Sequence, residues 1–498
     1  MSYLGLDIGT GGCKAVVFNK EGEELASAFK EHQVLYPHPD WAELDPDEVI
    51  DNCYQVIREV NEKISDPVVA MCISSQGEAF APVGKDGKTL SNAMVSSDSR
   101  AKDIAESWSK EFGVDKIYKI TGHTSHPLFS LYKILWIKEN RPDVWKEAKY
   151  FLCFEDFFYY KLGIEPRISW PLAGRTMMFD VIKHEWSKEI LKSVGLTADR
   201  LAIPIASGDV VGTLGLDKAK QLGFKNSVML VAGGHDQTIG ALGAGVVEPG
   251  MCMYASGSVE CFCPILEKPS FSPELQKNNL CCYDYSIKGR YTDVAYSLTG
   301  GNILRWVRDE LGQSEIAEAA KTGNNVYELL CDAMPEDPTN LLVLPYFSAT
   351  GTPYFDTRAK GAIIGLQLSS TKGDIIKALL EGVALEMKLN LELMEQSGMN
   401  ITTFIATGGG TRNNTWVQLK SDVLNKKIIV RDVKESGCYG AAMLACSAME
   451  KIPVEDLLRQ GKIENLVFSP DPRKAKVYDK KFEAYKQLYP VLKQFWKD

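Results

Sequence analysis

The sequence predicts an α/β protein of two domains whose halves share one core pattern. At 498 residues, the chain is too long for a single hydrophobic core. Its start is predicted to form three strands, a helix and a further strand, and a weaker version of this order follows in the second half. Three strands before the first helix differ from a simple βαβ unit. We therefore expect a duplicated core.

The first half shows clear periodic signals. The hydrophobic pattern predicts a helix at 48–64 and strands at 3–8, 14–19, 23–30 and 68–74. Asp45 is a good capping residue, and Pro46 favours the first helical position, so the helix is expected to begin here.

The second half contains corresponding signals. Residues 250–256 form a strand candidate that ends in the small-residue turn Ser256-Gly257-Ser258. A strand-rich stretch continues to Thr292, and a helix around 301–311 and a strand at 341–345 follow. Gly and Ala concentrate at 240–249, so we expect domains at 1–245 and 246–498.

Composition narrows the class of protein. Hydrophobic residues make up 45% and charged residues 24%, as in ordinary soluble globular proteins. The net charge of −9 argues against nucleic acid or an anionic membrane as a partner. The start lacks a signal-peptide pattern, and no run of about 18 apolar residues predicts a membrane span. The twelve cysteines include no C-x-x-C pair, so we expect reduced, buried thiols in a cytoplasmic protein.

The most informative segment is the turn after the first strand. The strand ends near Asp7, and Gly9-Thr10-Gly11-Gly12 and Lys14 follow. Backbone N–H groups in a glycine-rich turn can surround phosphate oxygens, and an acid beside it can hold a hard cation through water. The turn leads into a strand and lacks the G-x-G-x-x-G spacing, so a dinucleotide-binding Rossmann fold is discounted.

Two further glycine-rich segments follow apolar strands. The first ends in Gly233-Gly234-His235-Asp236. Asp236 is suited to act as a general base on a hydroxyl, and equally to cap a helix. The second is the triple glycine at 408–410, which suits close approach to a planar base or a phosphate but also suits a plain turn.

Polar side chains also follow other strand-like runs. Gln76 and Glu78 come after the strand at 68–74, and Asp98 and Arg100 follow a later apolar run. Such side chains are suited to hydrogen-bond a polyol. Solvated loop charges are the alternative interpretation of each residue taken alone.

Taken together and in this order, these segments resemble the FGGY family of carbohydrate kinases, members of the actin-like ATPase superfamily. The resemblance covers essentially the whole chain. The start at Asp7 is shared by the wider superfamily. The combination is more specific: it adds Gly233-Gly234-His235-Asp236, residues 361–381, the triple glycine at 408–410 and the segment 36–43.

The resemblance implies two ribonuclease-H-like domains that flank a deep catalytic cleft, with sugar bound largely by the first. It implies Asp7 as the acid that positions Mg²⁺ and Asp236 as the base that takes the proton of the attacking hydroxyl. The implied ATP-binding residues are Gly9, Thr10, Gly11, Gly12, Lys14, Ser256, Gly257, Ser258, Gly301, Gly409, Gly410 and Asn414. The implied sugar-binding residues are Gln76, Glu78, Asp98, Arg100, Asp236 and Gln237.

The identity of the sugar stays open. Xylulokinases usually have Gln-Met-His-Gly where this chain has Gln76-Gly77-Glu78-Ala79, and glycerol kinases have Gln-Arg-Glu. We expect a kinase for a ketopentose, with D-xylulose first and glycerol, gluconate or another polyol or sugar acid as alternatives. An actin-like phosphohydrolase and a sugar- or nucleotide-binding regulator are the non-kinase alternatives. By resemblance to xylulokinases, a homodimer is plausible.

Overall fold

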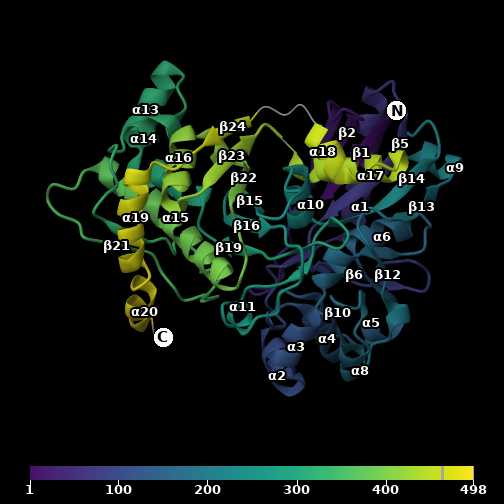
Figure 1. Ribbon diagram of the computed structural model, residues 1–498. Helices are drawn as coiled ribbons and strands as arrows, with labels where there is room; N and C mark the ends of the chain where they lie inside the picture. Colours follow the sequence, from purple (N-terminus) through teal and green to yellow (C-terminus); the bar gives the residue numbers. More distant parts are fainter. Residues whose placement is uncertain (434, 461–464, 497–498) are drawn as a thin grey trace.

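A computed structural model describes residues 1–433, 435–460 and 465–496. Two six-stranded sheets form the centres of two lobes (Figure 1). The first sheet has the order β13-β14-β5-β1-β2-β3. Its strands are β1 (Ser2–Ile8), β2 (Gly12–Asn19), β3 (Glu24–Glu31), β5 (Val68–Ser75), β13 (Val210–Leu214) and β14 (Val228–His235).

The second sheet repeats the first. Its order is β19-β16-β15-β22-β23-β24, from β15 (Met251–Ser256), β16 (Glu260–Pro264), β19 (Ala295–Ser297), β22 (Thr403–Thr407), β23 (Lys427–Arg431) and β24 (Asn465–Phe468). In both sheets three successive strands pair antiparallel: β1, β2 and β3 in the first sheet and β15, β16 and β19 in the second. Two strands then add in parallel, β5 and β14 or β22 and β23, and an antiparallel edge strand follows, β13 or β24. The expected duplicated core is confirmed.

Helices and short strands surround the first sheet. The expected helix start is confirmed, since the Asp45 carboxylate accepts hydrogen bonds from the Asp47 and Glu48 N–H groups and Pro46 opens α1. The helices are α1 (Pro46–Lys63), α2 (Lys102–Phe112), α3 (Val114–Thr121), α4 (Ser130–Asn140), α5 (Pro142–Glu147), α6 (Phe154–Lys161), α7 (Trp170–Gly174), α8 (Lys188–Val194), η1 (Ala198–Arg200), α9 (Leu216–Gln221) and α10 (Asp236–Gly243). The short strands are β4 (Glu43–Leu44), β6 (Phe80–Gly84), β7 (Ala93–Met94), β8 (Ala148–Cys153), β9 (Arg167–Ser169), β10 (Phe179–Asp180), β11 (Glu185–Trp186) and β12 (Ile203–Ile205).

The second half of the sequence adds further helices and short strands, most of which surround the second sheet. The expected helix at 301–311 is confirmed as α12 (Gly301–Leu311). The other helices are α11 (Pro273–Lys277), α13 (Gln313–Thr322), α14 (Val326–Asp332), α15 (Lys372–Gln396), η2 (Gly409–Arg412), α16 (Asn414–Leu424), α17 (Ser436–Glu450), α18 (Val454–Gln460), α19 (Pro472–Tyr485), α20 (Leu488–Leu492) and η3 (Lys493–Trp496). The short strands are β17 (Tyr283–Asp284), β18 (Tyr291–Thr292), β20 (Leu342–Leu344) and β21 (Ala362–Ile364).

Late in the chain, α17 returns to the first lobe and packs against β1, β5 and α10 (Figure 1). The helices α10 and α17 cross at glycines: a Cβ on Gly243 would lie 1.9 Å from the Ser436 carbonyl oxygen, and one on Gly440 would lie 2.3 Å from that of Ile239. Only glycine permits this approach. The contact between α10 and α17 therefore ties the end of the chain to the first sheet, while the expected division at residue 245 stays a prediction.

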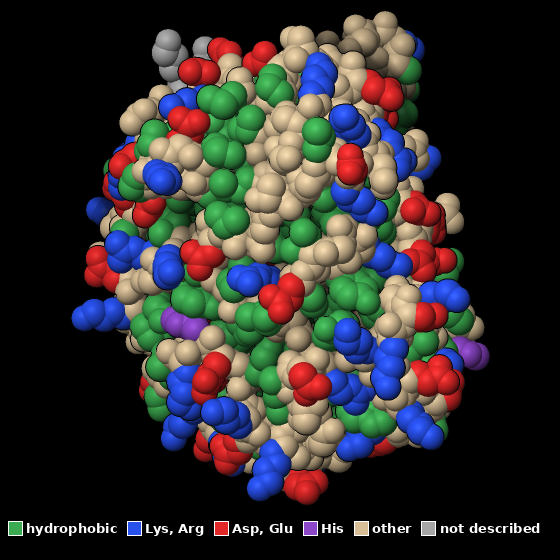
Figure 2. Space-filling model, turned by 90° about the vertical axis from the view of Figure 1, so that its right-hand side faces the viewer, with side chains coloured by type: hydrophobic (Ala, Val, Ile, Leu, Met, Phe, Trp, Pro, Cys, Tyr) green, Lys and Arg blue, Asp and Glu red, His purple; other side chains and the backbone are tan. Residues whose placement is uncertain are grey.

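The surface carries both signs of charge. On the face in Figure 2, Lys and Arg side chains are interspersed with Asp and Glu. Among the described residues, no helix combines the length and apolar character needed to cross a membrane. All twelve cysteines are buried and free, as the sequence predicted.

Candidate active site

The first glycine turn, residues 9–12, connects β1 to β2. The Gly9 N–H donates to the Gly12 carbonyl at 3.0 Å and closes the turn. Gln76, the residue after β5, stabilises the turn through two hydrogen bonds. The Thr10 hydroxyl donates to Gln76 Oε1 at 2.9 Å, and Gln76 Nε2 donates to the Gly9 carbonyl at 3.2 Å. Both polar atoms of the Gln76 amide, which was expected to contact sugar, therefore bond to the first glycine turn. Its role as a sugar ligand stays a prediction.

Asp7 and Lys14 lie opposite each other on β1 and β2. The Ser74 hydroxyl donates to Asp7 Oδ1 at 2.6 Å. Burial raises the pKa of Asp7, and the Ser74 bond opposes that rise. Lys14 forms an ion pair with Glu435, the residue before α17. A carboxylate, a hydroxyl and a cation thus converge at the mouth of the first glycine turn.

The second glycine turn, residues 256–258, occupies the matching place between β15 and β16. The Gly301 N–H at the start of α12 donates to the Gly257 carbonyl at 2.7 Å. A Cβ on Gly410 would lie 2.0 Å from Ser256 Oγ, and one on Gly408 would lie 2.6 Å from the Ser256 carbonyl oxygen. Glycine at 408 and 410 is therefore needed for the triple-glycine segment to approach this turn.

A cavity of about 550 Å³ opens beside this convergence. Five of the residues expected to bind nucleotide line it: Gly257, Ser258, Gly301, Gly409 and Gly410. Asn414, which was also expected to bind nucleotide, lines a different cavity. Asn413 lines the first cavity and caps α16, since its Oδ1 accepts from the Trp416 N–H at 2.9 Å. The expected contact of Asn414 with nucleotide stays a prediction.

Beneath the second glycine turn lies a buried ion pair that the sequence analysis did not find. Lys420 Nζ on α16 is 2.9 Å from Glu260 on β16 and 2.5 Å from Ser256 Oγ. Ser256 also donates to Glu260 at 3.0 Å. The helix segment 416–424 also contains Gln418, Ser421 and Asp422, so its pattern did not single out Lys420.

Asp236 is the first residue of α10 and lies where β14 ends. Its side chain is 37% exposed. The surrounding protein desolvates the carboxyl group, and this is the largest cause that raises the pKa of Asp236 to about 7. The nearby carboxylates of Asp7 and Glu78 also raise it, whereas the Gln237 N–H and Arg175 lower it. A carboxyl group with this pKa suits proton transfer at neutral pH. Gln237, the next residue, makes no side-chain hydrogen bond within the described chain.

Glu78 and Arg175 form a buried pair close to Asp236. Arg175 Nε donates to Glu78 Oε1 at 2.6 Å, and both side chains are largely buried. Arg175 also lies over the ring of Phe129, with its guanidinium carbon 5.1 Å from the ring centre. Glu78 has a backbone φ of +63°, which non-glycine residues rarely adopt. Arg175 was missed from sequence, since nothing near it in the chain marks it as a partner of Glu78.

His235 and Tyr283 complete this group. His235 Nε2 is 3.2 Å from Asp236 Oδ1, and His235 Nδ1 is 3.0 Å from the Tyr283 hydroxyl. Tyr283 belongs to β17, in the second half of the sequence, yet it packs in the core of the first lobe. The Asp236 cluster is therefore defined as Glu78, Arg175, His235, Asp236 and Tyr283.

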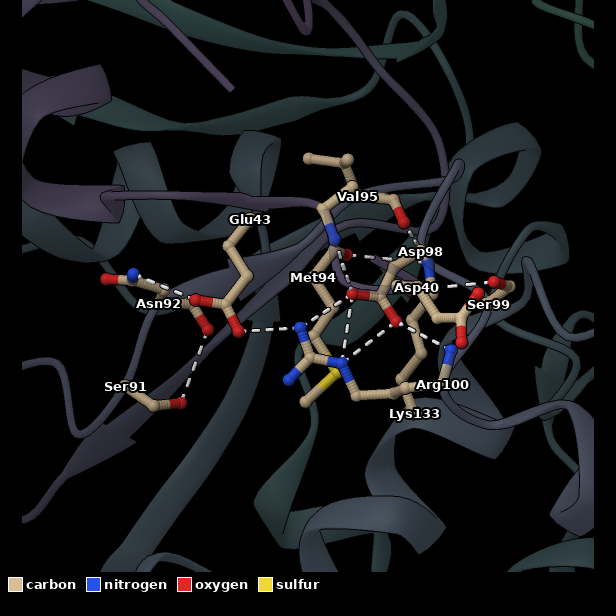
Figure 3. Close-up of polar contacts among 11 residues, drawn as sticks. Asp40, Glu43, Ser91, Asn92, Met94, Val95, Asp98, Ser99, Arg100 and Lys133 are labelled. Atoms are coloured by element: carbon tan, nitrogen blue, oxygen red, sulfur yellow. Dashed lines mark hydrogen bonds and ion pairs between the residues drawn. The ribbon is translucent and has the colours of Figure 1, made fainter. Parts of the chain in front are cut away.

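Asp98 and Arg100 lie in a separate cluster, and Figure 3 shows Arg100 held between Asp98 and Glu43. Asp98 also accepts from the Ala42 N–H at 2.8 Å. The Arg100 guanidinium stacks 3.7 Å from the centre of the Trp41 ring. No contact in the described residues joins this pair to Asp236, so their expected contact with sugar stays a prediction.

Sequence and structure comparisons identify the family. Residues 2–243 match the N-terminal domain of the FGGY family of carbohydrate kinases, and residues 264–449 match its C-terminal domain. The xylulose kinase of Bacillus subtilis (strain 168) is 25% identical over 499 residues, which cover 99% of this chain and 98% of that protein. The gluconokinase of the same strain is 27% identical over 454 residues, covering 90% and 88%.

Structural similarity agrees with these matches. The crystal structure of gluconate kinase from Lactobacillus acidophilus aligns with a TM-score of 0.89 at 23% identity and covers 99% of this chain and 98% of that one. At this identity the likeness shows the fold. The chain therefore belongs to the FGGY family of carbohydrate kinases, which are phosphotransferases, and has the two-domain, actin-like fold of that family.

Proposed function

We propose that the protein transfers the γ-phosphate of ATP to a hydroxyl group of a neutral ketopentose, with D-xylulose as the first candidate. FGGY kinases use ATP, and family membership sets aside the phosphohydrolase and the non-enzymatic regulator. The relatives named xylulose kinase and gluconokinase are similarly distant, at 25% and 27% identity. The choice between these substrates must therefore rest on the site itself.

The charge balance of the Asp236 cluster supports a neutral sugar. Gluconate carries a carboxylate, which would need a free cation in the site. Within the described part of the cluster the permanent cation is Arg175, and Glu78 already pairs with it. Burial lowers the pKa of His235 and His123 well below the ordinary value, so both imidazoles are neutral. Asp236 and Asp7 add negative charge nearby. This balance is the observation that carries the proposal.

The proposed chemistry assigns one task to each group. Asp236 takes the proton of the sugar hydroxyl as that oxygen attacks the γ-phosphorus. The two glycine turns direct backbone N–H groups at the phosphates, and Lys14 and the Thr10 hydroxyl offset the charge of the transferred group.

Asp7 fits a Mg²⁺ site, because Ser74 occupies its Oδ1 and leaves Oδ2 for an ion or its water. The described residues contain no cluster of three acidic, His or Cys side chains that would hold a metal alone. Asp7 would therefore share the ion with ATP, and Mg²⁺ supplies charge neutralisation on the phosphates.

A substrate panel tests the proposal. Purified protein is incubated with MgATP and, in separate reactions, D-xylulose, D-ribulose, glycerol and D-gluconate, and ADP release is measured. We expect the highest kcat/KM with a ketopentose and a much lower value with gluconate. A preference for gluconate would overturn the neutral-sugar assignment, and ADP release that no sugar or polyol stimulates would overturn the kinase assignment in this panel.

A further inference from the structure

We propose that His235 is a positioning residue that fixes the carboxylate of Asp236 for proton transfer, and that Tyr283 fixes the imidazole in turn. This inference rests on the proposed role of Asp236 as the base. His235 ends β14, and Asp236 begins α10. The imidazole is 5% exposed and Tyr283 is fully buried, so neither side chain has freedom to turn away.

The hydrogen-bond chemistry determines the direction of this chain of contacts. His235 Nε2 lies 3.2 Å from Asp236 Oδ1, and an ionised carboxylate attracts a protonated nitrogen, so we assign the proton of the neutral imidazole to Nε2. Nδ1 then has none and accepts from the Tyr283 hydroxyl at 3.0 Å. Burial lowers the pKa of His235 and raises that of Tyr283, so the imidazole stays neutral and the phenol keeps its proton.

This arrangement affects the base in two ways. A protonated Nε2 packed 3.2 Å from Oδ1 restrains the carboxylate by contact and charge attraction, and it leaves Oδ2 as the acceptor for the sugar hydroxyl. It also stabilises the ionised form of Asp236 against the carboxylates of Asp7 and Glu78, which favour protonation. Arg175 is the permanent cation that faces the same carboxyl group.

Gly77 provides the space for the imidazole. A Cβ at Gly77 would lie 3.0 Å from His235 Cδ2, 3.1 Å from its Nε2 and 3.4 Å from Arg175 Cγ. Even a methyl group there would press on an imidazole that the Tyr283 hydrogen bond and the contact with Asp236 hold in place. The absence of a side chain at 77 and the orientation of His235 are therefore parts of one arrangement.

The test compares His235→Ala, His235→Gln and Tyr283→Phe by kcat/KM for D-xylulose across pH 5.5 to 9. We expect His235→Ala to lower kcat/KM by about tenfold to a hundredfold and to move the acidic limb up by about one pH unit, since an attractive contact with a charged group is lost. His235→Gln keeps an N–H donor and should recover part of the loss. Tyr283→Phe should act in the same direction and more weakly, and the KM for ATP should stay constant in all three.

A second pair of variants protects the test against general damage. Gly77→Ala should reduce kcat in the wild-type protein, because the new methyl group presses on the His235 imidazole. In a protein that already carries His235→Ala it should cause little further loss, because the imidazole is absent. Gly215→Ala, where a Cβ meets nothing within 4 Å, is the matched control. The positioning role would be overturned if His235→Ala kept the kcat and the acidic limb of the wild-type protein. It would also be overturned if the losses caused by His235→Ala and Gly77→Ala added up in the double variant. Turnover in Asp236→Ala would instead overturn the proposed base.

Discussion

Lys420 and Glu260 form an ion pair directly beneath the second glycine turn, with their charged atoms 2.9 Å apart and side chains only 3% and 0% exposed. Lys420 also lies over the Trp416 ring, 3.9 Å from its centre. The pair holds Ser256 from below through hydrogen bonds of 2.5 Å and 3.0 Å. Two buried charges thus support a turn whose backbone is proposed to bind phosphate.

Replacing Lys420 with methionine should destabilise the protein strongly. Removal of one partner leaves the Glu260 carboxylate buried without its cation, which typically costs about 3–5 kcal/mol of unfolding free energy. The measurement is urea denaturation followed by tryptophan fluorescence. Lys63→Met is the matched control, because it breaks the exposed Lys63–Glu59 pair and should cost at most about 0.5 kcal/mol. Equal midpoints for the two variants would contradict the structural role of Lys420.

Asp236→Ala should separate chemistry from nucleotide binding. Loss of a general base typically lowers the rate by about 10²–10⁴-fold, while the second glycine turn, where ATP is proposed to bind, is left intact. We therefore expect a collapse of kcat with nearly unchanged ATP binding, measured by isothermal titration calorimetry with a non-hydrolysable analogue. Near-normal turnover would remove Asp236 from the mechanism.

The pH dependence follows from the raised pKa of Asp236. Only the ionised carboxylate can accept the proton, and burial with the nearby carboxylates raises its pKa to about 7. Activity should therefore be full above neutral pH and fall as pH drops through about 7, on the order of tenfold per unit further down. A kcat/KM profile for the free enzyme measures this limb. A limb near pH 4, the ordinary range for Asp, would contradict the shift.

The sequence predicted the architecture better than the pairing of side chains. The positions of the first strands, the Asp45 cap and the two glycine turns are local, because each depends on residues close together in the chain. The Asp236 cluster is not local, since Arg175 and Tyr283 reach it from segments about 60 and 50 residues away along the chain. No periodicity encodes such a meeting.

Gln76 shows a second limit of sequence reasoning. Its place after the strand at 68–74 suggested contact with sugar, which stays a prediction, but did not reveal that its amide bonds to Thr10 and Gly9. Residues two apart point to the same side of a strand, but only while the strand continues. At Glu78 the backbone turns to a positive φ, so the direction of its side chain could not be read from the pattern.

Glu78→Gln should change the preferred substrate. The substitution removes the carboxylate that neutralises Arg175 and leaves a free guanidinium in the site. We expect kcat/KM for D-xylulose to fall and the ratio of gluconate to D-xylulose to rise, with the KM for ATP nearly unchanged. The substrate panel with both sugars measures this ratio. An effect confined to the KM for ATP would place Glu78 outside the sugar site.

Glu435→Gln should tighten the binding of ATP. In the structure Lys14 pairs with Glu435, so phosphate oxygens must compete with this carboxylate for the same ammonium group. The side chains are 28% and 34% exposed, and such a pair contributes up to about 1 kcal/mol, which corresponds to a gain in affinity of at most about fivefold.

Glu24→Gln is the matched control for this variant. Glu24 lines the same surface cavity as Glu435 and is exposed, but it forms no ion pair with Lys14. It therefore removes an equal charge without freeing the lysine. Calorimetric titration with ATP should show the gain for Glu435→Gln and a smaller change for Glu24→Gln. Equal shifts in the two variants would attribute the effect to net charge alone, and the ion pair would then have no part in phosphate binding.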